Sequence, residues 1–161
     1  MILVTVGGQL PFDRLIRCVD QWAGEAGRTD VFAQIGDSQF APKNIENAPF
    51  LDPAAFQERF EAARVIVSHA GMGTVISALE AAKPILVLPR RFALNEQRND
   101  HQLATVERLK DRPGVFVAMD EGELRDALSK IDELAPAQRI ETTAAPELLS
   151  ALKAFVEESG A

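Results

Sequence analysis

Short apolar runs alternate along this chain with longer segments in which apolar residues recur at helical spacing. Six runs have the length and β-branching of buried strands, at residues 2–6, 30–36, 48–51, 65–67, 85–88 and 114–118. The helical spacing predicts helices at residues 12–22, 53–63, 74–82, 100–109, 120–131 and 146–158. Strands that alternate with helices are typical of parallel sheets. The pattern therefore predicts an α/β fold, an open, Rossmann-like parallel sheet with helices on both faces.

Length and composition favour one cytoplasmic domain, residues 1–161. Of the 161 residues, 47% are hydrophobic and 25% charged, as in ordinary soluble domains. We find no secretion signal and no apolar run near the roughly 20 residues that cross a bilayer. We therefore expect any membrane contact to be peripheral or through a partner. The net charge of −7 argues against nucleic-acid binding. Cys18, the single cysteine, excludes an internal disulfide and a cysteine-rich zinc site, and we expect it in the core.

Two glycine-containing loops carry the clearest chemical signal. Gly71 and Gly73 lie between a predicted strand and a predicted helix, and we expect them to adopt backbone conformations that other residues resist. The N–H groups and the dipole at a helix start attract anions such as a diphosphate. Gly7 and Gly8 follow the first strand in the same way and let the backbone approach a ligand. Each loop is also compatible with a tight turn in a domain that binds nothing.

One long segment resembles the donor-binding half of family 28 glycosyltransferases, which include MurG-like enzymes. It runs from HAGMGT through KPILVLP to Asp100, His101 and Gln102. The stretch VTVGGQLPFD near the amino terminus looks like the start of small catalytic subunits of split enzymes in this family. These subunits add the second N-acetylglucosamine to dolichol diphosphate or belong to PssE-type exopolysaccharide glucuronosyltransferases. The resemblance spans residues 1–109 and implies the C-terminal half of a GT-B glycosyltransferase.

The resemblance also implies roles for individual residues. Gln102, and after it Asp100, match the positions that hydrogen-bond hydroxyls of the donor sugar. Ser77 stands where the family has a glutamate that holds the ribose, and Glu80, one helical turn later, is an alternative. Phe50 and Leu51 match positions that border the uracil; otherwise both are simply core residues.

Two arginines and a histidine add chemistry near the same sheet edge. Arg90 and Arg91 follow the fifth predicted strand, where guanidinium groups bind phosphate or carboxylate well, although each is also compatible with a solvated surface charge. His69 is the candidate catalytic base if it reaches the acceptor hydroxyl; otherwise it positions the loop or contacts the donor. The candidate donor-binding residues are Gly7, Gly8, Gln9, Phe50, Leu51, His69, Gly71, Met72, Gly73, Thr74, Ser77, Glu80, Arg90, Arg91, Asp100, His101 and Gln102.

The resemblance implies the UDP-sugar-binding, catalytic subunit of a two-component inverting hexosyltransferase. The hexose is glucuronic acid or N-acetylglucosamine, and the acceptor is a lipid-linked saccharide held by a membrane-associated partner subunit. We expect no metal or other cofactor, because the sequence has no metal-ligand cluster. A homodimer is left open, and the segment 146–158 either covers the sheet or docks on a partner. The alternative is a non-catalytic nucleotide-binding regulatory module; a dinucleotide site is disfavoured because G-x-G-x-x-G is incomplete.

Overall fold

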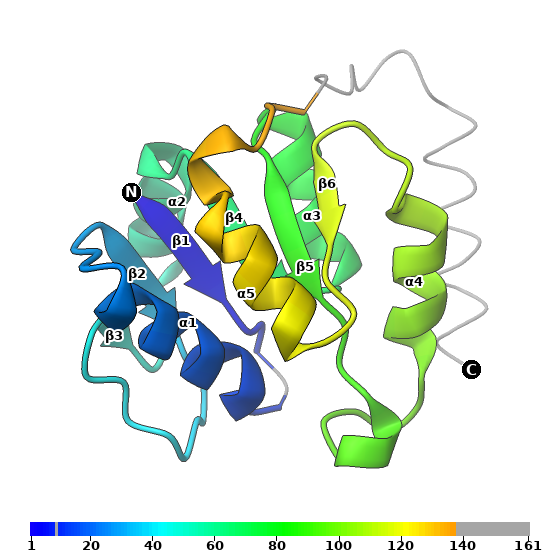
Figure 1. The fold of residues 1–161 in the computed structure, drawn as a ribbon, viewed down its shortest axis with the longest axis horizontal. Coiled ribbons are helices and arrows are strands. Elements are labelled where there is room, and N and C mark those ends of the chain that lie inside the picture. Colours follow the sequence, from blue (N-terminus) through cyan, green and yellow to red (C-terminus); the bar gives the residue numbers. More distant parts are fainter. Residues whose placement is uncertain (9, 138–161) are drawn as a thin grey trace.

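The computed structural model describes residues 1–8 and 10–137, which form a parallel sheet between two layers of helices (Figure 1). The strands are β1 (Ile2–Thr5), β2 (Val31–Gln34), β3 (Glu46–Ala48), β4 (Val65–His69), β5 (Ile85–Leu88) and β6 (Val115–Val117). The helices are α1 (Asp13–Glu25), α2 (Pro53–Ala62), α3 (Met72–Glu80), α4 (His101–Leu109) and α5 (Glu121–Ser129), with 3-10 turns η1 (Phe92–Leu94) and η2 (Ile131–Glu133). The predicted α/β fold is confirmed.

The strand order places a crevice at the middle of the sheet. The order is β3-β2-β1-β4-β5-β6, with every neighbouring pair parallel. From β1 the chain builds outward to β2 and β3, and it then returns to build β4, β5 and β6 on the other side. Thr5 at the end of β1 pairs with Ser68 of β4. The loops after β1 and β4 diverge from this point, which is where parallel sheets of this kind bind ligands.

Two separate cores hold the helices onto the sheet. Ile2 and Val4 of β1 belong to a core with α1 and α5, whereas Leu3 belongs to the core beneath α2, α3 and α4. This division follows from the period of two residues in a strand, which sends successive side chains to opposite faces. In Figure 1, α1 and α5 lie together in front of the sheet. Cys18 is buried in the first core, as predicted.

Some predicted boundaries differ from the structure. The third strand was predicted at residues 48–51 but lies at Glu46–Ala48, and one reason is that Pro49 has no N–H group to extend the pairing. Phe50 therefore lies beyond the strand and is 51% exposed, so its interpretation as a core residue is wrong. Helix α3 begins at Met72, two residues earlier than predicted. The predicted helix at 146–158 lies outside the described residues.

Arg90 joins the two loops at the carboxyl edge of the sheet. Its side chain is 3% exposed, so its interpretation as a solvated surface charge is wrong. Nη2 donates hydrogen bonds to the carbonyls of Val6 and Leu10 at 2.7 and 2.6 Å. Nη1 donates to the carbonyls of Pro11 and Glu96 at 2.7 and 3.2 Å. The β1–α1 loop is thereby fastened to the segment that follows β5.

An ion pair fixes the same segment to α1. Glu96 accepts from Nε and Nη2 of Arg14 at 2.7 and 2.8 Å, and both side chains are only 11% exposed. The Glu96 carboxylate also accepts from the Arg91 N–H at 3.0 Å. The guanidinium carbons of Arg14 and Arg90 lie 5.3 and 4.6 Å from the centre of the Phe12 ring, within cation–π range. Residues 90–96 are therefore anchored from two sides.

Replacement of Arg90 by methionine should destabilise the fold. Arg90→Met leaves four carbonyl groups without their donor, and we expect the free energy of unfolding to fall by about 3 kcal/mol or more. Urea unfolding followed by circular dichroism measures this change. Arg98→Met is the matched control, because Arg98 is an exposed arginine of the same segment and should change stability by under about 0.5 kcal/mol. Similar losses for both variants would contradict the structural role of Arg90.

Candidate functional site

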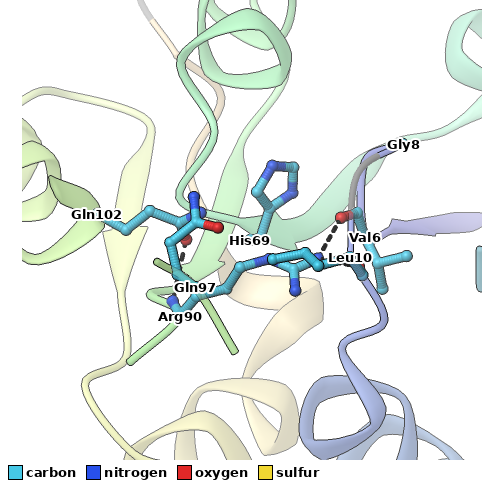
Figure 2. A pocket seen from close by; sticks show the side chains of 7 residues that line it. All are labelled: Val6, Gly8, Leu10, His69, Arg90, Gln97 and Gln102. Carbon is cyan, nitrogen blue, oxygen red and sulfur yellow. Dashed lines mark hydrogen bonds between the residues drawn. The ribbon is translucent and has the colours of Figure 1, made fainter. Parts of the chain in front are cut away.

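A pocket lies at the carboxyl edge of the sheet, where the loops after β1, β4 and β5 meet. It is lined by Val6, Gly8, Leu10, His69, Arg90, Gln97 and Gln102 (Figure 2). Its volume of about 70 Å³ is far below the roughly 300–1,000 Å³ usual for small-molecule sites. A nucleotide sugar would therefore extend out of this pocket along the neighbouring loops.

Two glycines make room for the His69 ring. A Cβ atom on Gly7 would lie 2.7 Å from the imidazole Cε1, and one on Gly71 would lie 2.2 Å from Nε2. Gly7 also has a φ of +74°, which disfavours other residues, but Gly71 has an ordinary φ of −85°. The prediction of unusual backbone geometry at Gly71 and Gly73 is wrong: neither is in the left-handed region. What Gly71 supplies is space for His69.

His69 is neutral in this setting. Burial, and after it the positive charge of Arg90, lower the pKa of the imidazole from 6.5 to about 4. Its Nδ1 lies 3.3 Å from the hydroxyl of Ser68, a residue with no exposed surface. An imidazole with so low a pKa is a weak base near neutral pH. The low pKa therefore favours a positioning or donor-contacting role for His69 over that of general base.

The start of α3 offers unoccupied backbone donors. Within the described residues, the N–H groups of Met72, Gly73 and Thr74 have no hydrogen-bond acceptor, and no side chain caps the helix. A Cβ atom on Gly73 would meet no atom within 4 Å, so the space above it is open. Free amides and the positive end of the helix dipole make this a seat for an anion.

Gln102 points into the pocket from α4 and is 7% exposed. Its Oε1 accepts a hydrogen bond from the backbone N–H of Arg90 at 2.9 Å, which fixes the side chain (Figure 2). Its two amide N–H groups remain as donors. Asp100 instead accepts from the N–H of Phe92 at 3.0 Å, and His101 is exposed; neither lines the pocket.

Other predicted site residues lie outside the pocket. Arg91 donates to the carbonyl of Met119, while its buried Nε has no partner among the described residues. Leu51 packs partly against the core below α2, so both of its predicted roles stay open. Ser77 and Glu80 are exposed on α3. Gln9 lies outside the described residues.

Sequence reasoning missed Gln97, which lines the pocket. It lies in a polar segment without periodicity, and its nearness to Gln102 in the chain was the one available signal. Among the described residues, no group of three or more His, Cys, Asp or Glu side chains could hold a metal ion. The helices of this part of the chain also include none with the length and apolar character of a membrane span.

Acid should destabilise this protein through His69. Because the pKa in the folded state is below that in the unfolded state, the unfolded state binds the proton more tightly, and stability falls as pH drops from about 6.5 toward about 4. We expect the free energy of unfolding to be about 1 kcal/mol lower at about pH 5.5 than at about pH 7.5. Urea titrations at both pH values measure it. His69→Asn should reduce this difference; an unchanged difference would contradict the assignment.

Comparison with known proteins identifies the family of this chain. Residues 1–155 match the model of the glycosyltransferase family 28 C-terminal domain. The human UDP-N-acetylglucosamine transferase subunit ALG13 is 31% identical in an alignment of 126 residues, which covers 71% of this chain but only 11% of that protein's length.

Two solved structures share the fold. The NMR structure of ALG13 has a TM-score of 0.64 at 16% identity, covering 92% of this chain and 93% of that one. Acinetobacter baumannii MurG has a TM-score of 0.65 at 20% identity, covering 97% of this chain and 49% of that one. The predicted likeness to the C-terminal halves of GT-B enzymes is confirmed. With a family match over residues 1–155, this chain belongs to glycosyltransferase family 28, as a C-terminal domain of that family.

Proposed function

We propose that this chain is the UDP-sugar-binding, catalytic subunit of a two-component inverting glycosyltransferase. The observation that carries the proposal is the open start of α3, where three backbone N–H groups close to the His69 pocket have no acceptor among the described residues. Family 28 membership and the identity to a human UDP-N-acetylglucosamine transferase subunit support the donor class. The chemistry is transfer of a hexose with departure of UDP.

The diphosphate is proposed to bind the amides of Met72, Gly73 and Thr74, facing the loop that contains Gly7 and Gly8. The positive end of the α3 dipole stabilises the charge that develops on UDP as the bond to the sugar breaks. Because these donors are part of the backbone, their position depends on the fold and not on a side-chain rotamer. A divalent cation is not needed for this binding.

The ribose is proposed to lie nearer Ser77 than Glu80. Ser77 is five residues along α3 from Met72, about 7.5 Å along the axis, whereas Glu80 is eight residues away, about 12 Å. A ligand whose phosphates bind at the helix start reaches Ser77 more easily. For the uracil we propose the neighbourhood of Phe50 and Leu51, because the exposed Phe50 ring follows β3 at the same edge of the sheet.

The sugar is proposed to occupy the pocket beside Gln102, and its identity to be N-acetylglucosamine. Glucuronate is suggested by the resemblance to PssE-type subunits, and Arg90 and Arg91 would suit its carboxylate. Each terminal nitrogen of Arg90 instead donates two hydrogen bonds to backbone carbonyls, so no N–H on either remains for a carboxylate fork. Arg91 does not line the pocket. The human relative's name also supports N-acetylglucosamine.

The acceptor, a lipid-linked saccharide, is proposed to come from a membrane-associated partner subunit, at the cytoplasmic face of a membrane. The general base would also belong to the partner, because the low pKa of His69 makes it a weak base. The chain covers 49% of MurG, which leaves room in that enzyme for a second half.

UDP and UDP-N-acetylglucosamine should bind in the presence of EDTA, and isothermal calorimetry measures both affinities. Gln102→Ala should weaken binding of the UDP-sugar by about 1 kcal/mol or more, because one polar contact to the sugar is lost. The affinity for UDP should stay nearly unchanged. Gln57→Ala, at an exposed glutamine of α2, is the matched control and should change neither affinity. Binding that appears only when magnesium is added would contradict the proposed diphosphate site. Equal losses of affinity for the two ligands would contradict the proposed contact between Gln102 and the sugar.

The purified chain should not transfer sugar to a polyprenyl-diphosphate saccharide until its partner is added. Transfer of radiolabelled N-acetylglucosamine, with and without a co-expressed membrane partner, measures this requirement. Thr74→Pro should abolish activity of the pair, since it removes one of the three free amides while proline remains compatible with the first turn of a helix. Robust transfer by the chain alone would contradict the two-component proposal. UDP-sugar binding without transfer under any pairing would favour the non-catalytic module.

A further inference from the structure

The polar groups of the pocket are mostly engaged within the protein. Both terminal nitrogens of Arg90 donate to backbone carbonyls, and Oε1 of Gln102 accepts from the Arg90 N–H. Nδ1 of His69 lies within hydrogen-bond distance of the Ser68 hydroxyl. The exceptions within the described residues are the two N–H groups of Gln102 and the whole side-chain amide of Gln97. Gln97 lines the pocket and is half-buried, and its side-chain amide forms no hydrogen bond with the described residues.

Gln97 is also held in place by its neighbour in the chain. The Glu96 carboxylate pairs with Arg14 through two bonds of 2.7 and 2.8 Å, and its carbonyl accepts from Arg90 at 3.2 Å. The backbone next to Gln97 is therefore anchored to α1 and to the buried guanidinium. Figure 2 shows the Gln97 side chain extending from this segment into the pocket with its amide at the tip. Such a side chain can contact a ligand at little cost in ordering the backbone.

The two glutamines offer complementary chemistry. With its oxygen occupied, Gln102 presents N–H donors alone, whereas a sugar hydroxyl both donates and accepts. The unoccupied oxygen of Gln97 is an acceptor in the same pocket. We infer that Gln97 is a specificity-determining residue for the donor sugar, and that its side-chain oxygen accepts a hydrogen bond from a hydroxyl or N–H group of that sugar. This inference depends on the proposed function.

The test compares UDP-N-acetylglucosamine with UDP by calorimetry on the full chain. Gln97→Ala should lower the affinity for the UDP-sugar by about fivefold or more, as expected for one lost polar contact to the sugar. The affinity for UDP should change by no more than about twofold. Gln97→Glu keeps an acceptor oxygen, so the ratio of the two affinities should stay within about twofold of that of the unmodified chain. Gln57→Ala is the matched control, and urea unfolding should show the same stability for all variants.

The possible outcomes separate the two proposals. If the unmodified chain binds neither ligand, the proposed function fails and this inference fails with it. If it binds both and Gln97→Ala changes nothing, or weakens both ligands equally, the proposed function stands and the role of Gln97 is overturned. If Gln97→Glu lowers the ratio as much as Gln97→Ala does, the acceptor role is overturned.

Discussion

The buried guanidinium of Arg90 is the interaction on which the carboxyl edge of the sheet depends. Four hydrogen bonds from one side chain hold carbonyls on both sides of the crevice, from Val6 to Pro11 and at Glu96. Burial lowers the pKa of Arg90 only to about 10, so the group stays charged near neutral pH. A charged donor to neutral carbonyls is stronger than an uncharged one, which suits a residue that must order two loops.

The same charge shapes the chemistry beside it. Arg90 contributes to the low pKa of His69, and its backbone N–H sets the orientation of Gln102. One residue thus organises the pocket without offering its own terminal N–H groups to a ligand. The groups that we propose to bind the ligand are neutral: the amides at the start of α3 and the side chains of Gln97 and Gln102. In the reaction that we propose, neutral, fixed dipoles of this kind would stabilise a departing diphosphate without reorganisation.

The glycines of the site have different physical roles. Gly7 adopts a positive φ and also lies against the His69 ring, so both its conformation and its lack of a side chain matter. Gly71 has an ordinary conformation and supplies only space for the same ring. Gly73 faces open space at the start of α3, which leaves room for a ligand. A glycine pattern in a sequence does not distinguish these three uses, because each depends on which neighbour folds against it.

Local pattern by itself determined the α/β class, the existence of each described strand and helix, and the place of the glycine loops at the carboxyl ends of strands. Strand and helix periods are properties of neighbouring residues, so they can be read from the chain. Tertiary structure decided that Arg90 is buried, because its partner Leu10 lies 80 residues away. It also decided that Gln97 lines the pocket, since the anchoring of its segment comes from Arg14, 82 residues distant from Glu96. Such long-range contacts leave no local pattern.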